Sequence, residues 1–87
     1  MALPRYCVTV PRFFFHLYND IECRDEEGIE MPNAAIALQR AAAAARSMAA
    51  ESVLKGRLAL DHRIVVEDEA GGHIGTVRFR DVVEITL

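Results

Sequence analysis

Three side chains of types that bind zinc in other proteins occur near the start of the chain: Cys7, His16 and Cys23. Structural zinc requires four thiolate or imidazole ligands at short, regular spacings. The spacings here match no such pattern, and the sequence offers no evident fourth ligand. We therefore interpret both cysteines as small buried side chains with reduced thiols, and we expect no metal and no other cofactor.

Carboxylates gather between Asp20 and Glu30, but they lack the alternating ligand spacing and closing glutamate of a calcium loop. Their expected roles are solubility and a favourable interaction with the positive end of the helix that follows. No serine or cysteine has a general base at a recognisable spacing, and no helix after Gly71-Gly72 is expected to hold a phosphate. The sequence thus predicts a protein that is not an enzyme.

The length and charge of the chain restrict its fold and its partners. Its 87 residues suit one domain, and its net charge of −3 argues against bulk attraction to nucleic acid or to anionic lipid. Prolines at positions 4 and 11, with Arg12, interrupt the N-terminal apolar stretch, so we expect no signal peptide. No apolar run approaches the length of a membrane span. We expect a soluble cytoplasmic protein with no membrane contact.

One helix dominates the expected fold. Pro32 and Asn33 indicate where it begins, with Asn33 as the N-cap, and Gly56 is expected to end it. The intervening residues are almost all good helix formers, and ten of them are alanine. The sequence predicts a single helix over residues 34–55.

Strands are expected before and after this helix in the sequence, because β-branched and aromatic residues alternate in both regions between turn residues. Two precede the helix and two follow it: residues 12–18, 21–24, 63–68 and 73–80. Val83, Ile85 and Leu87 alternate in the same way and predict a short final strand.

The expected architecture is α+β with the order ββαββ: one long helix packed on one face of a small, mainly antiparallel sheet. Residues 11–87 form this single domain. Residues 1–10 are expected to be an N-terminal extension or an additional edge strand.

Apolar residues lie on two opposite faces of the predicted helix. The wider stripe is expected to cover the sheet and contains Ala34, Leu38, Ala41, Ala45, Met48, Ala49, Ser52 and Val53. The thinner stripe contains Ile36, Ala43, Ala50 and Leu54, with Gln39 and Arg46 along one side and Arg40 and Glu51 along the other.

Two interpretations of the thinner stripe stay open. A helix of about 33 Å would overhang strands of about 23 Å, and an overhang with a second stripe favours a homo-oligomer or another small protein as partner. Alternatively, exposed alanines reflect helix propensity alone, and single exposed apolar residues are normal.

The far face of the sheet is also a candidate surface. If Phe13, Phe15 and Leu17 face the helix, the alternating side chains must point away from it: Phe14, His16, Tyr18, Arg63, Val65, Glu67, Ile74, Thr76, Arg78 and Arg80. Such a face could stack single-stranded nucleic acid, bind another protein chain, or consist of ordinary cross-strand pairs with arginine stems covering the rings. The acidic net charge counts against nucleic acid.

Three motifs occur in a fixed order. Residues 12–17 read Arg-Phe-Phe-Phe-His-Leu, residues 25–32 read Asp-Glu-Glu-Gly-Ile-Glu-Met-Pro, and an alanine-rich helix follows. With the closing hairpin, this order resembles a family of short bacterial proteins, common in proteobacteria, that is classified as a domain of unknown function. The resemblance spans about residues 11–86, implies the fold above and carries no activity; residues 1–10 depart from it.

A looser similarity, in layout alone, is to antitoxin-like domains of the HicB type. It implies a small toxin as partner, although Pro32-Asn33-Ala34 replaces the segment typical of those domains. The leading prediction is a non-catalytic interaction module that self-associates; a single-stranded nucleic-acid binder and a toxin-binding protein are the alternatives.

Overall fold

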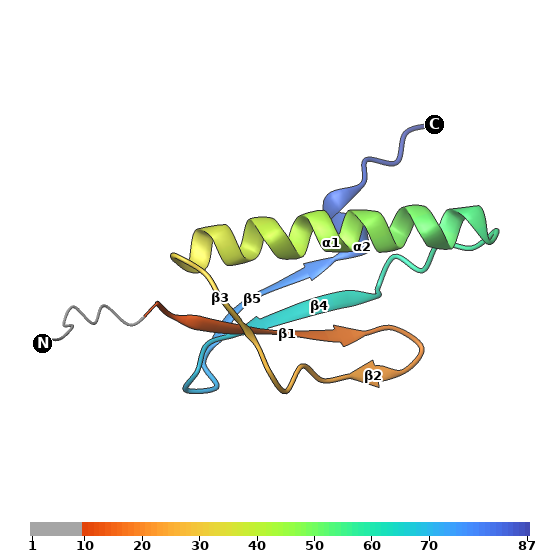
Figure 1. The fold of residues 1–87 in the computed structure, drawn as a ribbon. Coiled ribbons are helices and arrows are strands. Elements are labelled where there is room, and N and C mark those ends of the chain that lie inside the picture. Colours follow the sequence, from red (N-terminus) through yellow and green to blue (C-terminus); the bar gives the residue numbers. More distant parts are fainter. Residues whose placement is uncertain (1–9) are drawn as a thin grey trace, which may run out of the picture.

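The computed structural model describes residues 10–87, so the predicted extension or edge strand over residues 1–10 lies almost wholly outside the described residues. The elements are β1 (Arg12–Tyr18), β2 (Glu22–Cys23), β3 (Ile29–Glu30), α1 (Ala34–Leu54), β4 (Arg63–Glu67), β5 (His73–Arg78) and α2 (Phe79–Val82). One long helix lies along an antiparallel sheet, which confirms the predicted α+β class (Figure 1). The short elements β3 and α2 add to the predicted order.

The strands lie in the order β2-β1-β4-β5, and every pair is antiparallel. Both β2 and β3 pair with β1, at opposite ends of it: Leu17 faces Cys23, and Phe13 faces Ile29. The segment between β2 and β3, residues 24–28, therefore leaves the sheet and returns to it. We call this segment the 24–28 loop.

The C-terminal part of the sheet departs from the prediction in two places. The register of β4 and β5 shifts at Val66/Glu67, where Gly75 pairs with Val66 and His73 pairs with Glu67. Because this irregularity leaves one residue unpaired, Ile74 packs against the core and is not on the far face, as was predicted.

The chain then leaves the sheet sooner than expected. Strand β5 ends at Arg78, and Asp81 accepts a hydrogen bond from the backbone N–H of Arg78 at 2.9 Å, which starts the single turn of α2. Residues 83–87 form no strand, so the predicted final strand is wrong.

Helix α1 begins and ends at the predicted signals. The Asn33 side chain accepts from the Ile36 N–H at 2.9 Å, which is an N-cap. At the other end Gly56 has φ +89°, and the N–H groups of Gly56 and Arg57 donate to the carbonyls of Val53 and Ser52. This is a Schellman motif. No helix within residues 10–87 is long and apolar enough to cross a membrane.

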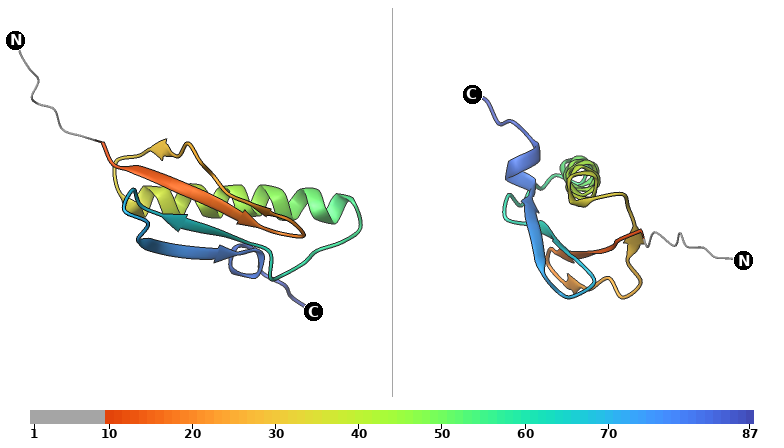
Figure 2. Two further views of the ribbon diagram at one scale, coloured as in Figure 1. Left: turned by 90° about the horizontal axis from the view of Figure 1, so that it is seen from below. Right: turned by 90° about the vertical axis from the view of Figure 1, so that its left-hand side faces the viewer.

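The core lies between α1 and one face of the sheet (Figure 2, right). The helix contributes four alanines spaced by one turn, Ala37, Ala41, Ala45 and Ala49, each at most 1% exposed. The sheet contributes Phe13, Ile64 and Val66, with Phe15, Leu17 and Val77 packed beside them. The small side chains of these four alanines let the helix lie close to the larger side chains of the sheet, and Leu38 and Met48 pack beside them.

This packing confirms most of the predicted wide stripe and corrects it at two positions. Ala37 is fully buried although it was not included, and Val53 is 55% exposed although it was. Val53 lies in the last turn of α1, where the helix runs past the ends of the strands (Figure 1).

Candidate functional site

The face of α1 opposite the core carries the predicted thin stripe, here called the outer stripe: Ile36, Ala43, Ala50 and Leu54. All four residues are exposed, Ile36 by 37% and Leu54 by 86%. They recur at seven-residue and four-residue intervals, so they follow one side of the helix over about 27 Å. The structure thus brings together the four helix residues that the sequence indicated.

Charged residues border the outer stripe on one side. Arg40 and Glu51 are both exposed there, and neither has an ion pair within residues 10–87. They are separated by about 16 Å along the axis, which is too far for a contact within one helix. On the other side, Arg46 Nε donates to the Val82 carbonyl at 3.1 Å and ties α2 to α1.

The far face of the sheet contains Phe14, His16 and Tyr18, as predicted. Strand pairing places them opposite Glu67, Val65 and Arg63. His16 is not accessible there, however: only 3% of it is exposed. The 24–28 loop contacts the ring, so His16 cannot be part of an exposed interaction surface.

Both ring nitrogens of His16 have partners. The backbone N–H of Asp25 donates to Nδ1 at 3.0 Å, and Nε2 lies 3.1 Å from Oε1 of Glu67. Because Nδ1 accepts, we assign the proton of the neutral ring to Nε2, which donates to the Glu67 carboxylate. Through these two hydrogen bonds, the His16 ring links β1 to β4 and to the 24–28 loop.

Asp25 holds the 24–28 loop against β1. Its carboxylate accepts from the backbone N–H groups of Phe15 at 3.1 Å, Glu27 at 3.1 Å and Gly28 at 3.0 Å. Burial opposes ionisation of this carboxyl, but the three donors outweigh it and lower the pKa of Asp25. In the gap between β2 and β3, the side chain thus replaces the missing strand partner of β1.

The two aromatic rings of the far face are already in contact with protein groups. The backbone of Gly28 packs against Phe14, since a Cβ at Gly28 would lie 2.9 Å from Phe14 Cε2. The Arg63 guanidinium lies 4.8 Å from the centre of the Tyr18 ring, and Arg24 donates to the Tyr18 hydroxyl at 3.4 Å. Of the three interpretations, this arrangement favours ordinary cross-strand pairing.

The two remaining candidates of this face lie apart. Arg78 ends β5 and is exposed, whereas Arg80 is in α2, where it pairs with Asp61. The prediction that Arg80 shares the far face is wrong because the strand ends two residues before it.

Cys23 is also placed differently from the prediction. It is exposed, because β2 is a two-residue edge strand. Cys7 lies outside the described residues.

The sequence indicated an acidic loop from Asp25 onward with a role in solubility, but the part of the Asp25 carboxylate in holding the 24–28 loop was missed. A signal was present, since an aspartate three residues before a glycine is typical of a turn closed by the carboxylate, and Gly28 has φ +72°.

Comparison with known proteins gives the family of the chain. No curated protein and no solved structure matches it. Residues 12–80 match the family model described as a domain of unknown function, DUF6894. This match spans most of the chain, which therefore belongs to the DUF6894 family.

Proposed function

We propose that this protein is a non-catalytic interaction module of the cytoplasm that self-associates through the outer stripe of α1. The observation that carries the proposal is the exposure of Ile36 and Leu54 directly opposite the buried alanines. A helix packed on one side only does not require apolar residues there. The proposed partner is a second copy of the chain.

The charges beside the outer stripe favour an antiparallel pair of helices related by a two-fold axis. In such a pair the same side of each helix meets the same side of its partner, running in the opposite direction. The midpoint between Arg40 and Glu51 nearly coincides with the midpoint between Ile36 and Leu54, near residue 45. One antiparallel alignment therefore places Arg40 of each copy beside Glu51 of the other. The same alignment places Ile36 of each copy near Leu54 of the other.

A parallel pair would lack this pairing, because it would place the side with Arg40 and Glu51 against the side of the second helix that carries Gln39 and Arg46. Ala43 lies near the centre of the antiparallel pair and Ala50 lies between the centre and Leu54, and at both positions a small side chain allows close approach of the two backbones.

The size of the surface limits the strength of this association. A single stripe of about 27 Å buries less area than the roughly 800 Å² per partner of a standard interface. We therefore expect a dissociation constant in the micromolar range or weaker, and a monomer–dimer equilibrium that depends on concentration.

Sedimentation equilibrium tests the proposal. The apparent mass of the wild type is expected to rise from 9.7 kDa toward twice that value as the concentration increases through the micromolar range. Combined replacement Ile36→Glu and Leu54→Glu is expected to weaken association by at least about tenfold, because carboxylates would be placed at an apolar contact.

A matched control carries the same chemical change elsewhere. Ile21 and Ile85 are 75% and 60% exposed and lie outside α1, so Ile21→Glu with Ile85→Glu should associate like the wild type. A wild type that stays at the monomer mass at high micromolar concentration contradicts the proposal, as does equal weakening by both double variants.

A further inference from the structure

The buried ring of His16 is held in a state that a second ring proton would disrupt. The backbone N–H of Asp25 donates to Nδ1 at 3.0 Å, and a backbone N–H can only donate. The imidazolium carries a proton on both ring nitrogens, so protonation would place an N–H of the ring against an N–H of the backbone. Only 3% of His16 is exposed, and buried donors without an acceptor are costly.

The contact on the other side of the ring does not depend on the 24–28 loop. Nε2 of His16 lies 3.1 Å from Oε1 of Glu67, a residue of β4. This carboxylate favours the charged ring, and the pairing of β1 with β4 holds it in place. It therefore remains available to the imidazolium when the loop has left the sheet.

The charged groups that the loop itself brings to the ring have opposite signs. The Asp25 carboxylate attracts an imidazolium, but it already accepts from three backbone N–H groups. Arg24, whose guanidinium lies 4.0 Å from the Glu67 carboxylate, repels one. Glu26 and Glu27 are exposed. Further along this face are Tyr18 with its strand partners Glu22 and Arg63, and His73 as the β5 partner of Glu67.

Closure of the loop therefore acts against the charged ring. The loop supplies the donor that occupies Nδ1 and covers the ring, whereas Glu67 stays in place without it. Once the loop is open, His16 can hold a second proton that the closed loop opposes. Because the open loop binds more protons than the closed loop, closure is favoured at high pH and weakens as the pH falls.

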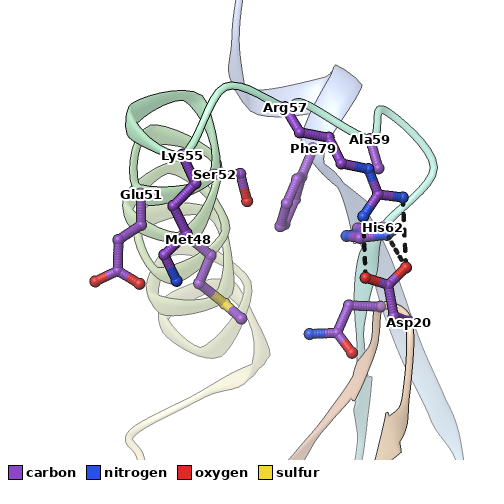
Figure 3. Close-up of a pocket in the computed structure, with 10 residues that line it drawn as sticks. Asp20, Met48, Glu51, Ser52, Lys55, Arg57, Ala59, His62 and Phe79 are labelled. Atoms are coloured by element: carbon purple, nitrogen blue, oxygen red, sulfur yellow. Dashed lines mark hydrogen bonds and ion pairs between the residues drawn. The ribbon is translucent and has the colours of Figure 1, made fainter.

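The other two histidines lack this arrangement. His62 lines a cavity of about 410 Å³ beside Lys55, formed by the last turns of α1, the β1–β2 turn and the loop between α1 and β4 (Figure 3). Its Nε2 faces an acceptor, Oδ1 of Asp20 at 3.6 Å, so protonation adds an attraction there. His73 is exposed, with Nε2 2.9 Å from a threonine hydroxyl. Among the described residues, neither ring accepts from a backbone N–H.

We propose that the 24–28 loop is a pH-sensitive cover of the sheet, which lies on β1 while His16 is neutral and leaves it when His16 gains a second proton. Its departure exposes the Phe14 ring, against which Gly28 packs, and the backbone of β1 between β2 and β3. The loop lies on the far face of the sheet, so its opening does not depend on self-association through the outer stripe.

Amide hydrogen exchange followed by NMR tests the cover in the wild type. Between pH 8 and pH 5, the range in which histidine ordinarily changes its charge, the protection factor of the Asp25 amide is expected to fall at least about fivefold. The fall should follow the titration of the His16 ring signals. Amides of β4, which is paired on both sides, should keep their protection.

Asp25 titrates outside this range. Although burial opposes ionisation of its carboxyl, the backbone donors lower the pKa of Asp25, so the carboxylate stays charged from pH 8 to pH 5. A loss of protection that begins only below about pH 4 would assign the opening to Asp25 and overturn the proposal, as would protection that does not change with pH.

Two asparagine variants separate His16 from the other histidines. His16→Asn places Oδ1 near the position of Nδ1, where it can accept from Asp25 without titrating, so protection should change by less than about twofold over the same range. His73→Asn, the same change at an exposed histidine, should keep the fall of the wild type. A fall that persists in His16→Asn contradicts the proposal.

Glu67→Gln gives an independent test that retains the ring. Without the carboxylate that favours the imidazolium, the loss of protection is expected to move to lower pH by about 0.5–1 unit. A loss at the same pH as in the wild type would mean that the opening does not follow the charge of His16.

Discussion

Replacing Phe79 by alanine is expected to lower the free energy of unfolding by about 3–5 kcal/mol. Phe79 is 2% exposed and is one of the two largest fully buried side chains of the described chain. It lies where β5 passes into α2 and packs in the core, so its removal would leave a cavity there. Urea denaturation followed by circular dichroism measures the loss.

The effect should be large relative to the whole stability, since small domains are stable by about 5–15 kcal/mol. Ile85→Ala serves as the control, because Ile85 is 60% exposed and its truncation should change stability by less than about 0.5 kcal/mol. A loss below about 1 kcal/mol for Phe79→Ala would mean that its ring does not pack in the core as described.

Gly28→Ala is expected to cost about 2–4 kcal/mol, from two causes that a second glycine separates. Gly28 has φ +72°, and an added Cβ would lie 2.9 Å from the carbonyl oxygen of Phe13 and 2.9 Å from the Phe14 ring. Backbone strain and a clash with β1 therefore add together. The change should also release the 24–28 loop from His16.

Gly56→Ala is the matched control. Gly56 also has a positive φ, of +89°, but no atom lies within 4 Å of an added Cβ. It should show only the strain, about 1–2 kcal/mol. The difference between the two losses, measured in the same urea titrations, gives the cost of the close approach; equal losses would contradict the packing of the loop on β1.

The helix was predictable because its signals are local. Asn33 and Gly56 define its ends through their own side chain and backbone, and the alanines between them have high helix propensity whatever they contact. Which residues of the helix are buried was predicted less well, since this depends on how the helix lies on the sheet: Ala37 is fully buried, and the overhang exposes Val53 in the last turn.

The C-terminal segment was mispredicted because two patterns compete there. Alternation of Val83, Ile85 and Leu87 is typical of a strand. Instead, the Asp81 side chain accepts a hydrogen bond from the backbone N–H of Arg78, and a helical turn starts there. The alternation of apolar residues does not indicate this turn. The register shift that buries Ile74 likewise arises from the pairing of two strands. The alternation of residues within either strand does not indicate it.

The candidate surfaces also differ in whether one element defines them or several segments must meet. The outer stripe follows from helix periodicity, so its four residues were identified together. Burial of His16 required a loop folded by Asp25, and the cavity beside Lys55 required three segments to meet. Neither arrangement follows from the period of one element.

A charge-reversal cycle at the helix surface tests the central claim most directly: that α1 covers the sheet with one face and pairs antiparallel with a second copy through the other. Arg40→Glu and Glu51→Arg should each weaken dimerisation, by about three- to tenfold in sedimentation equilibrium, and the two changes together should restore it. Single changes without effect, or a combined variant weaker than either, would contradict the antiparallel pair.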